Sequence, residues 1–244
     1  MEQTINNILG FPILSMLIVW PLVGAACILF INRTNEKAIK MVSLLYSVAT
    51  FLLSIFLFTN FDKSTHMMQF VERYAWIPNL NINYHLGLDG ISVLFVLLAT
   101  LVTILCVLVS WESVKMKTKE FFICLLVIEA AMIGVFCSLD FMLFYIFWEA
   151  MLIPMYLLIG VWGTGPKEYS AMKLTLMLLI GSAFVLVGFL ALYHASGMHT
   201  FDLQQLAQAH FSNDFQKWVF PLIFVGFGVI GALYPLHTWS PDGH

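Results

Sequence analysis

The chain has 244 residues, of which 61% are hydrophobic and 10% are charged, and its formal net charge at pH 7 is −3. This composition, with a mean hydropathy of +0.90, excludes a soluble globular protein, and the small net charge gives no indication of a nucleic-acid partner. The four cysteines lie inside apolar runs without CxxC spacing, which argues against a disulfide framework or a metal site: Cys27, Cys106, Cys124 and Cys137.

Seven segments are apolar over about 18 residues or more, the length that a bilayer requires of a helix. We therefore predict an all-α polytopic membrane protein with about seven transmembrane helices. The segments are Phe11–Ile31, Met41–Phe58, Asp89–Trp111, Phe121–Cys137, Asp140–Trp162, Ser170–Tyr193 and Trp218–Tyr234. Alternation in Asn81-Ile82-Asn83-Tyr84 indicates a short hairpin outside the membrane, and Thr200–Gln216 is predicted to form a surface helix.

Basic residues are concentrated in alternate connections, which predicts the orientation of the chain. Basic residues favour the cytoplasmic side, so the N-terminus is expected outside. The connections after the first, third and fifth segments hold Arg33, Lys37, Lys40, Lys115, Lys117, Lys119 and Lys167, whereas the opposite side holds Lys63, Arg73 and Lys217.

Glu149 lies near the middle of the fifth segment. An ionisable group there costs at least about 2.5–3.5 kcal/mol on insertion scales, which indicates a function. Pro154 leaves the carbonyl of Ala150 without its helical donor, and Tyr145 and Tyr156 fall on the same helical face. The pattern favours ion or proton transfer, with a structural glutamate paired to a neighbouring helix as the alternative.

Glu129 is a second intramembrane carboxyl, and it lies ten residues before the turn near Leu139, as Glu149 lies ten after it. At about 1.5 Å per residue, both lie roughly 15 Å into the membrane. If the two face each other, one should stay protonated. A structural role for Glu129, hydrogen-bonded to a helix carbonyl, is an equal alternative.

Two further residues are candidates for the same chemistry. Lys173 lies one to two turns inside the sixth segment, where it either faces inward or extends to the surface. His237 follows the glycine-rich seventh segment, and its imidazole suits a proton relay. A metal site formed by His237, Asp242 and His244 has weak support, because their spacing is not diagnostic.

Three motifs then point to one family. They are Leu86-Gly87-Leu88-Asp89-Gly90-Ile91-Ser92, Phe147-Trp148-Glu149-Ala150-Met151-Leu152-Ile153-Pro154-Met155-Tyr156 and Pro235-Leu236-His237-Thr238-Trp239-Ser240-Pro241-Asp242-Gly243-His244. Together they resemble the M-type antiporter-like membrane subunits of the proton-pumping NADH-quinone oxidoreductase, complex I. The resemblance runs along essentially the whole chain.

The resemblance implies a proton-translocating subunit without a redox centre, in a bacterial inner membrane. NADH, flavin, iron–sulfur clusters and quinone are expected in partner subunits, and the partners are other membrane subunits and the lipid bilayer. It also implies proton-pathway roles for Glu149, Lys173 and His237. Residues 1–120 correspond to three N-terminal helices with an extracytoplasmic loop, and 121–244 to the start of the first antiporter-like helix repeat.

The chain departs from the family pattern at two points. The lysine that usually pairs with the glutamate should fall five positions before Pro235, where this chain has Ile230. We therefore expect Lys173 to act as the positive partner. The family also has about fourteen helices in two inverted repeats, so this chain is interpreted as an N-terminal portion. A subunit of a related cation/proton antiporter and a non-pumping remnant are the alternatives.

Overall fold

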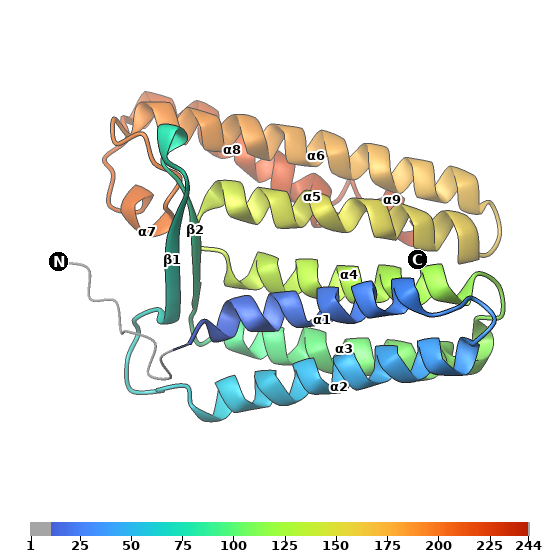
Figure 1. Cartoon of the computed structure of the whole chain (residues 1–244). Helices are drawn as coiled ribbons and strands as arrows, with labels where there is room; N and C mark the ends of the chain where they lie inside the picture. The colour runs from blue at the N-terminus through green and yellow to red at the C-terminus, as the bar shows by residue number, and fades with distance from the viewer. Residues whose placement is uncertain (1–10, 244) are drawn as a thin grey trace. The chain divides into compact units, whose positions relative to one another are not determined.

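The computed structural model describes residues 11–243, and most of them are helical (Figure 1). The chain forms two compact units. The first unit consists of the residues up to Arg73 together with His85–Ser138, and the second of Tyr74–Tyr84 together with the residues from Leu139 onward. The predicted N-terminal location and the predicted role of His244 concern residues outside the described range.

The first unit is a bundle of four long helices. Ile28, Ile39, Val107 and Phe122, one from each helix, are fully buried in a shared core. The helices are α1 (Ile13–Phe30), α2 (Glu36–Thr59), α3 (Ser92–Ser113) and α4 (Thr118–Cys137). All four correspond to predicted segments, because hydropathy over a bilayer length fixes where such helices lie.

Two contacts join the connections at one end of this bundle. Lys119 donates hydrogen bonds of 2.8 Å to the carbonyl oxygens of Leu29 and Ile31. Arg33 forms an ion pair with Glu120 at 2.8 Å. The basic connections after α1 and α3 therefore lie at the same end of the first unit, as the predicted topology requires.

A two-stranded hairpin lies between α2 and α3 in the sequence. Strand β1 (Gln69–Ile77) pairs with β2 (Ile82–Leu88) through the 3-10 turn η1 (Pro78–Leu80) and Asn81, whose φ of 51° lies in the left-handed region. Asparagine tolerates this conformation better than most residues. The predicted hairpin is confirmed, and its side of the membrane stays a prediction.

Glu72 on β1 accepts hydrogen bonds from the first turn of α1. Its carboxylate accepts hydrogen bonds from the backbone N–H groups of Leu14 at 2.7 Å and Ser15 at 3.1 Å, and from the Ser15 hydroxyl. These N–H groups belong to the first helical turn, which has no acceptors within its own helix. Burial raises the pKa of the Glu72 carboxyl, although the hydrogen bonds from Ser15 and Leu14 act in the opposite direction.

The second unit is also built mainly of helices. They are α5 (Phe141–Leu157), its π-helical continuation η2 (Leu158–Trp162), α6 (Lys167–Ala195), α7 (Leu203–Leu206), α8 (Asn213–Ile230) and α9 (Trp239–Gly243). Helices α6 and α8 approach closely at small residues. A Cβ atom on Gly188 would lie 2.2 Å from Cγ1 of Ile223, and one on Gly181 would lie 3.0 Å from Cβ of Val229.

The predicted surface helix over Thr200–Gln216 is wrong, because two helix caps divide this segment. Asp202 accepts hydrogen bonds from the N–H groups of Gln204 at 3.0 Å and Gln205 at 3.1 Å, and so starts the single turn of α7. Ser212 accepts from Phe215 N–H at 3.3 Å and starts α8. Side chains that cap a helix fix its first residue, so the end of the segment belongs to α8.

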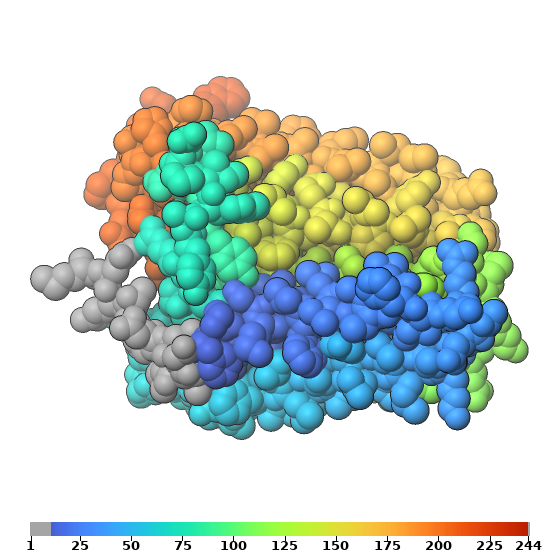
Figure 2. Space-filling view, in the orientation of Figure 1, coloured from blue at the N-terminus to red at the C-terminus, as the bar shows by residue number. Residues whose placement is uncertain are grey.

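Six of the described helices are long and apolar enough to cross a membrane: α1, α2, α3, α4, α5 with η2, and α6. Helix α8 corresponds to the seventh predicted segment, and it begins with the polar residues Asn213, Asp214, Gln216 and Lys217. The outward sides of α1 and α2, blue in Figure 2, carry exposed apolar side chains such as Val19 and Leu45. The predicted all-α membrane fold is confirmed.

The two compact units divide the chain after Ser138, because α4 shares its core with α1, α2 and α3. The predicted boundary after residue 120 marks the start of a helix repeat, which is a different property from the compactness of a unit. That boundary stays a prediction.

Candidate functional site

Glu149 is positioned by the start of α5. Asp140 caps this helix by accepting hydrogen bonds from Met142 N–H at 2.9 Å and Leu143 N–H at 3.2 Å. Glu149 follows nine residues later, about 13 Å along the helix axis. Its side chain is partly buried, and its Oε1 atom is buried without a hydrogen-bond partner in the part of the chain that the structure describes.

One hydroxyl group has a recorded interaction with this carboxyl. The Tyr145 hydroxyl, one turn earlier on α5, interacts with Glu149 and with the Ser182 hydroxyl of α6. Pro154, also inside α5, is buried and removes one backbone donor from the turn that follows Glu149. Tyr156 instead lies by a separate hollow whose lining includes Glu168. Of the two predicted tyrosines, Tyr145 is therefore the one with a recorded contact to the carboxyl.

Lys173 has a different partner from the predicted one. Its Nζ atom lies 2.5 Å from Oδ2 of Asp242 in α9 and 5.7 Å from the ring centroid of Tyr169. Tyr169 is one turn nearer the start of α6, so the lysine side chain extends toward that end of the helix. No ion pair between Lys173 and Glu149 occurs among residues 11–243. A role for Lys173 in proton transfer stays a prediction.

Position 230 lies in an apolar cluster. Its four buried members are Leu152, Leu174, Leu178 and Trp239, and Ile230 packs against them. The indole Nε1 of Trp239 donates a hydrogen bond of 2.9 Å to the carbonyl oxygen of Val229. Cγ1 of Ile230 lies 3.1 Å from a Cβ built on Gly181, next to Ser182 in α6. Ile230 is therefore close in space to the residues around Glu149.

His237 precedes α9 in the segment that leads away from α8. Its Nδ1 atom is buried without a hydrogen-bond partner among the described residues, and its ring centroid lies 5.6 Å from that of Tyr234. Its carbonyl oxygen accepts a hydrogen bond from Ser240 N–H at 3.0 Å. The imidazole therefore has one buried ring nitrogen without a hydrogen-bond partner among the described residues.

Glu129 lies in α4 and belongs to the first unit, whereas Glu149 belongs to the second. The Glu129 side chain is 0% exposed, and neither carboxyl oxygen has a hydrogen-bond partner within the described range. The predicted helix-carbonyl contact of a purely structural glutamate is thus not recorded for this group. That one of the two carboxyls stays protonated if they face each other remains a conditional prediction.

The specific contacts of three aspartates were not predicted from the sequence. Asp140 and Asp202 are both almost fully buried and pair in an antiparallel bridge, and Asp242 holds Lys173. Burial raises the pKa of Asp140, and the charge of Asp202 acts in the same direction, against hydrogen bonds from Asn83, Leu143 and Met142. An aspartate directly before an apolar run signals a helix cap, but no sequence signal pairs residues 62 positions apart.

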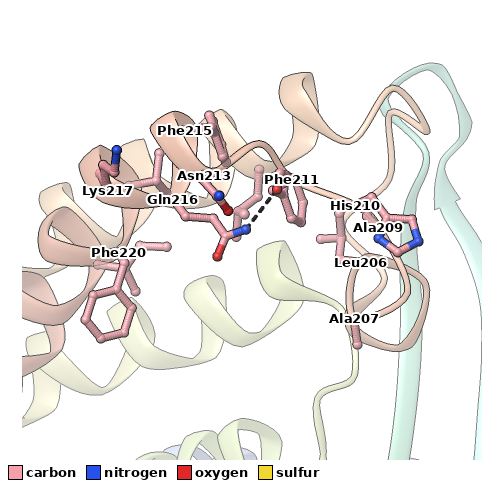
Figure 3. A pocket seen from close by; sticks show the side chains of 13 residues that line it. Leu206, Ala207, Ala209, His210, Phe211, Asn213, Phe215, Gln216, Lys217 and Phe220 are labelled. Carbon is pink, nitrogen blue, oxygen red and sulfur yellow. Dashed lines mark hydrogen bonds between the residues drawn. The ribbon is translucent and has the colours of Figure 1, made fainter.

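No group of three or more His, Cys, Asp or Glu side chains is arranged to hold a metal ion between residues 11 and 243. A cavity of about 760 Å³ lies at the start of α8, where Gln216 Nε2 donates a hydrogen bond of 2.8 Å to the Phe211 carbonyl (Figure 3). None of the predicted site residues lines this cavity.

Residues 138–244 match the family model described as NADH:quinone oxidoreductase/Mrp antiporter, TM. NADH-quinone oxidoreductase subunit M of Rickettsia prowazekii is 38% identical over 241 residues, which cover 97% of this chain and 49% of that protein. NADH-ubiquinone oxidoreductase chain 4 of Arabidopsis thaliana is 41% identical, covering 95% of this chain and 46% of that protein. The chain thus spans about half the length of these relatives.

Solved structures of membrane complexes contain chains with the same fold. A chain in the structure described as respiratory complex I from Thermus thermophilus with bound NADH superposes with a TM-score of 0.82 and 27% identity. The match covers 95% of this chain and 46% of that one. A chain of the archaeal membrane-bound sulfane sulfur reductase shares the fold, with a TM-score of 0.76 at 22% identity.

Proposed function

Because the chain belongs to the NADH:quinone oxidoreductase/Mrp antiporter family of membrane subunits, we propose that it translocates protons as part of a respiratory NADH-quinone oxidoreductase. Glu149 carries the proton in this proposal. The observation that supports this role is a carboxyl inside a membrane-spanning helix whose Oε1 atom is buried and has no hydrogen-bond partner among residues 11–243.

The surroundings of Glu149 suit a carboxyl that releases and rebinds a proton. An unpaired carboxylate is costly away from water, so a carboxyl in this position needs a nearby hydrogen-bond donor. The hydroxyl of Tyr145 is a donor that stabilises the carboxylate once the proton has left. A carboxyl that has a nearby donor and no ion pair can release and rebind a proton, which a carboxylate locked in an ion pair does less easily.

The other predicted residues act near the second unit's C-terminal segment. His237 passes protons through its available Nδ1 atom. Lys173, held by Asp242, is the cation of this half of the path, and a rearrangement that frees its ammonium from Asp242 is required before it can stabilise ionised Glu149. Ile230 cannot supply that charge.

The assembly follows from the same family relation. We propose that the chain associates with other membrane subunits in the bacterial inner membrane, with its N-terminus outside and the Lys115–Lys119 connection in the cytoplasm. NADH, flavin, iron–sulfur clusters and quinone bind to those partners. Labelling of a cysteine at position 113, in place of Ser113, by an impermeant reagent applied outside intact cells would reverse the orientation.

Replacing Glu149 by Gln in the assembled complex is expected to abolish the part of NADH-driven proton uptake that depends on this subunit, because an amide cannot release a proton. Proton uptake by inverted vesicles and NADH oxidation are measured together, so that the ratio of protons to electrons is obtained. Glu168→Gln is the matched control, since Glu168 is exposed at the start of α6. Wild-type pumping by the Glu149 variant would favour the non-pumping alternative.

A further inference from the structure

The interior of the α1–α4 bundle is unusually polar for a membrane protein. Four of the six buried residues of α2 carry hydroxyl groups, and they recur at helical spacing on a single face: Ser43, Ser47, Thr50 and Ser54. Helix α3 contributes Thr100 and Thr103 in the same way. The Ser54 and Thr100 hydroxyl oxygens are 2.8 Å apart, so the two hydroxyl faces meet inside the bundle.

Most of these hydroxyls are satisfied by their own helix. Ser43 donates to the Ile39 carbonyl at 2.9 Å, and Thr50 donates to the Tyr46 carbonyl at 2.8 Å. Ser47, between them on the same face, is 0% exposed and its hydroxyl has no partner within the described chain. Ser47 therefore has hydrogen-bonding capacity that Ser43 and Thr50 have already used.

Glu129 is directed into the same interior. It lies three residues after Leu126 and seven after Phe122, so the three share one face of α4. Phe122 and Leu126 are core residues that pack with α1, α2 and α3. A fully buried carboxyl with two unpartnered oxygens thus occupies the centre of the core-facing side of α4.

Helix α1 adds two polar groups to this interior. The Trp20 indole Nε1 is buried without a partner in the described residues, and its ring lies 5.5 Å from that of Tyr46, next to Ser47. Pro21 is a buried residue inside α1 and has no N–H group, so the carbonyl of Leu17 lacks its helical donor. Donors and acceptors on α1 and α2 therefore remain unmatched in the same bundle that holds the buried Glu129.

Among residues 11–243, no cation pairs with the Glu129 carboxyl. Apart from Glu129, the titratable side chains that lie more than five residues from either end of these four helices are Tyr46, Cys106 and Cys124, none of which is cationic. The lysines and remaining glutamates lie within the first or last five residues of these helices. An ionised carboxylate left unpaired inside protein is costly, so Glu129 is held as the neutral acid.

We propose that Glu129 is a proton-binding site of the first unit, distinct from Glu149, and that bound water joins its carboxyl to the Ser47 hydroxyl. Buried waters usually make about three hydrogen bonds to polar groups that lack other partners. The site needs only water and a proton. Its existence does not depend on proton translocation through Glu149.

The test measures the protonated carboxyl of Glu129 directly, in the assembled protein in lipid nanodiscs. Infrared difference spectra between wild type and Glu129→Gln should contain the C=O stretch of one protonated carboxylic acid. That band should shift when the protein is transferred to D₂O, because water reaches the site. The same band should persist when both proteins carry Glu149→Gln, which separates this site from the proposed pumping residue.

Two serine variants provide a matched pair, because both serines are 0% exposed on the same face of α2. Ser47→Ala should slow the D₂O-induced shift by about fivefold, the factor that corresponds to one net hydrogen bond. Ser43→Ala should leave the rate unchanged. A missing band, a band that never shifts, or equal effects of the two serine variants would each overturn the proposal.

Discussion

Trp239→Ala is expected to destabilise the second unit by about 3–5 kcal/mol, the usual cost of removing a buried Trp or Phe side chain. Trp239 is 6% exposed and belongs to the cluster of Leu152, Leu174 and Leu178. Its removal leaves a cavity there and also deletes the hydrogen bond to the Val229 carbonyl. Unfolding in mixed micelles with increasing sodium dodecyl sulfate measures the change.

Trp218→Ala is the control for that measurement. Trp218 is in the same unit but is 82% exposed, so its truncation should change stability by no more than about 0.5 kcal/mol. Equal losses for the two tryptophans would contradict the role assigned to the buried cluster.

Ile230→Lys is expected to show strong coupling to Glu149. The new ammonium would enter an apolar cluster close to Ser182, where the partly buried Glu149 could neutralise it. In a Glu149→Gln background the same lysine would have no counter-ion, and an unpaired buried charge is strongly destabilising. We therefore expect a coupling energy of about 1–3 kcal/mol in a double-mutant cycle.

The cycle requires four proteins, measured for unfolding in the same micelles: wild type, each single variant and the double variant. Val225→Lys serves as control, since Val225 is on the same helix but is exposed. Its cost should be the same with Glu or Gln at position 149. Additive costs for Ile230→Lys would mean that the Glu149 carboxyl does not reach position 230.

The sequence predicts those features that depend on short stretches of chain. The membrane helices follow from apolar length, and the hairpin follows from the alternation around Asn83. The helix over Thr200–Gln216 was wrongly predicted because apolar spacing outweighed the caps at Asp202 and Ser212. The sequence shows which residues are able to cap a helix, but the backbone geometry determines which of them do so.

The partner of Lys173 depends on tertiary structure and was not predictable in the same way. From the sequence, Lys173 is expected to be the positive partner of Glu149, because Ile230 stands where the family has a lysine; this expectation leaves out acids that compete for the ammonium. The structure places Asp242, 69 positions later, within 2.5 Å of the ammonium. An ion pair with a carboxylate in the following connection needs a chain reversal after α8 that no local pattern specifies.

The contact between Glu72 and the start of α1 sets an order for events during synthesis. The N–H of Leu14 donates to the carboxylate of Glu72, 58 residues later in the chain. The first turn of α1 therefore lacks this acceptor until α2 and the first strand have been synthesised. Residues Tyr74–Tyr84, in contrast, are synthesised before the rest of their unit and so precede their partners. The N–H of Asn83 donates to the Asp140 carboxylate, and the side-chain amide of Asn81 donates to the His199 carbonyl. One strand of the hairpin thus supplies the acceptor for a helix made before it, whereas the tip of the hairpin supplies donors for segments that are made after it.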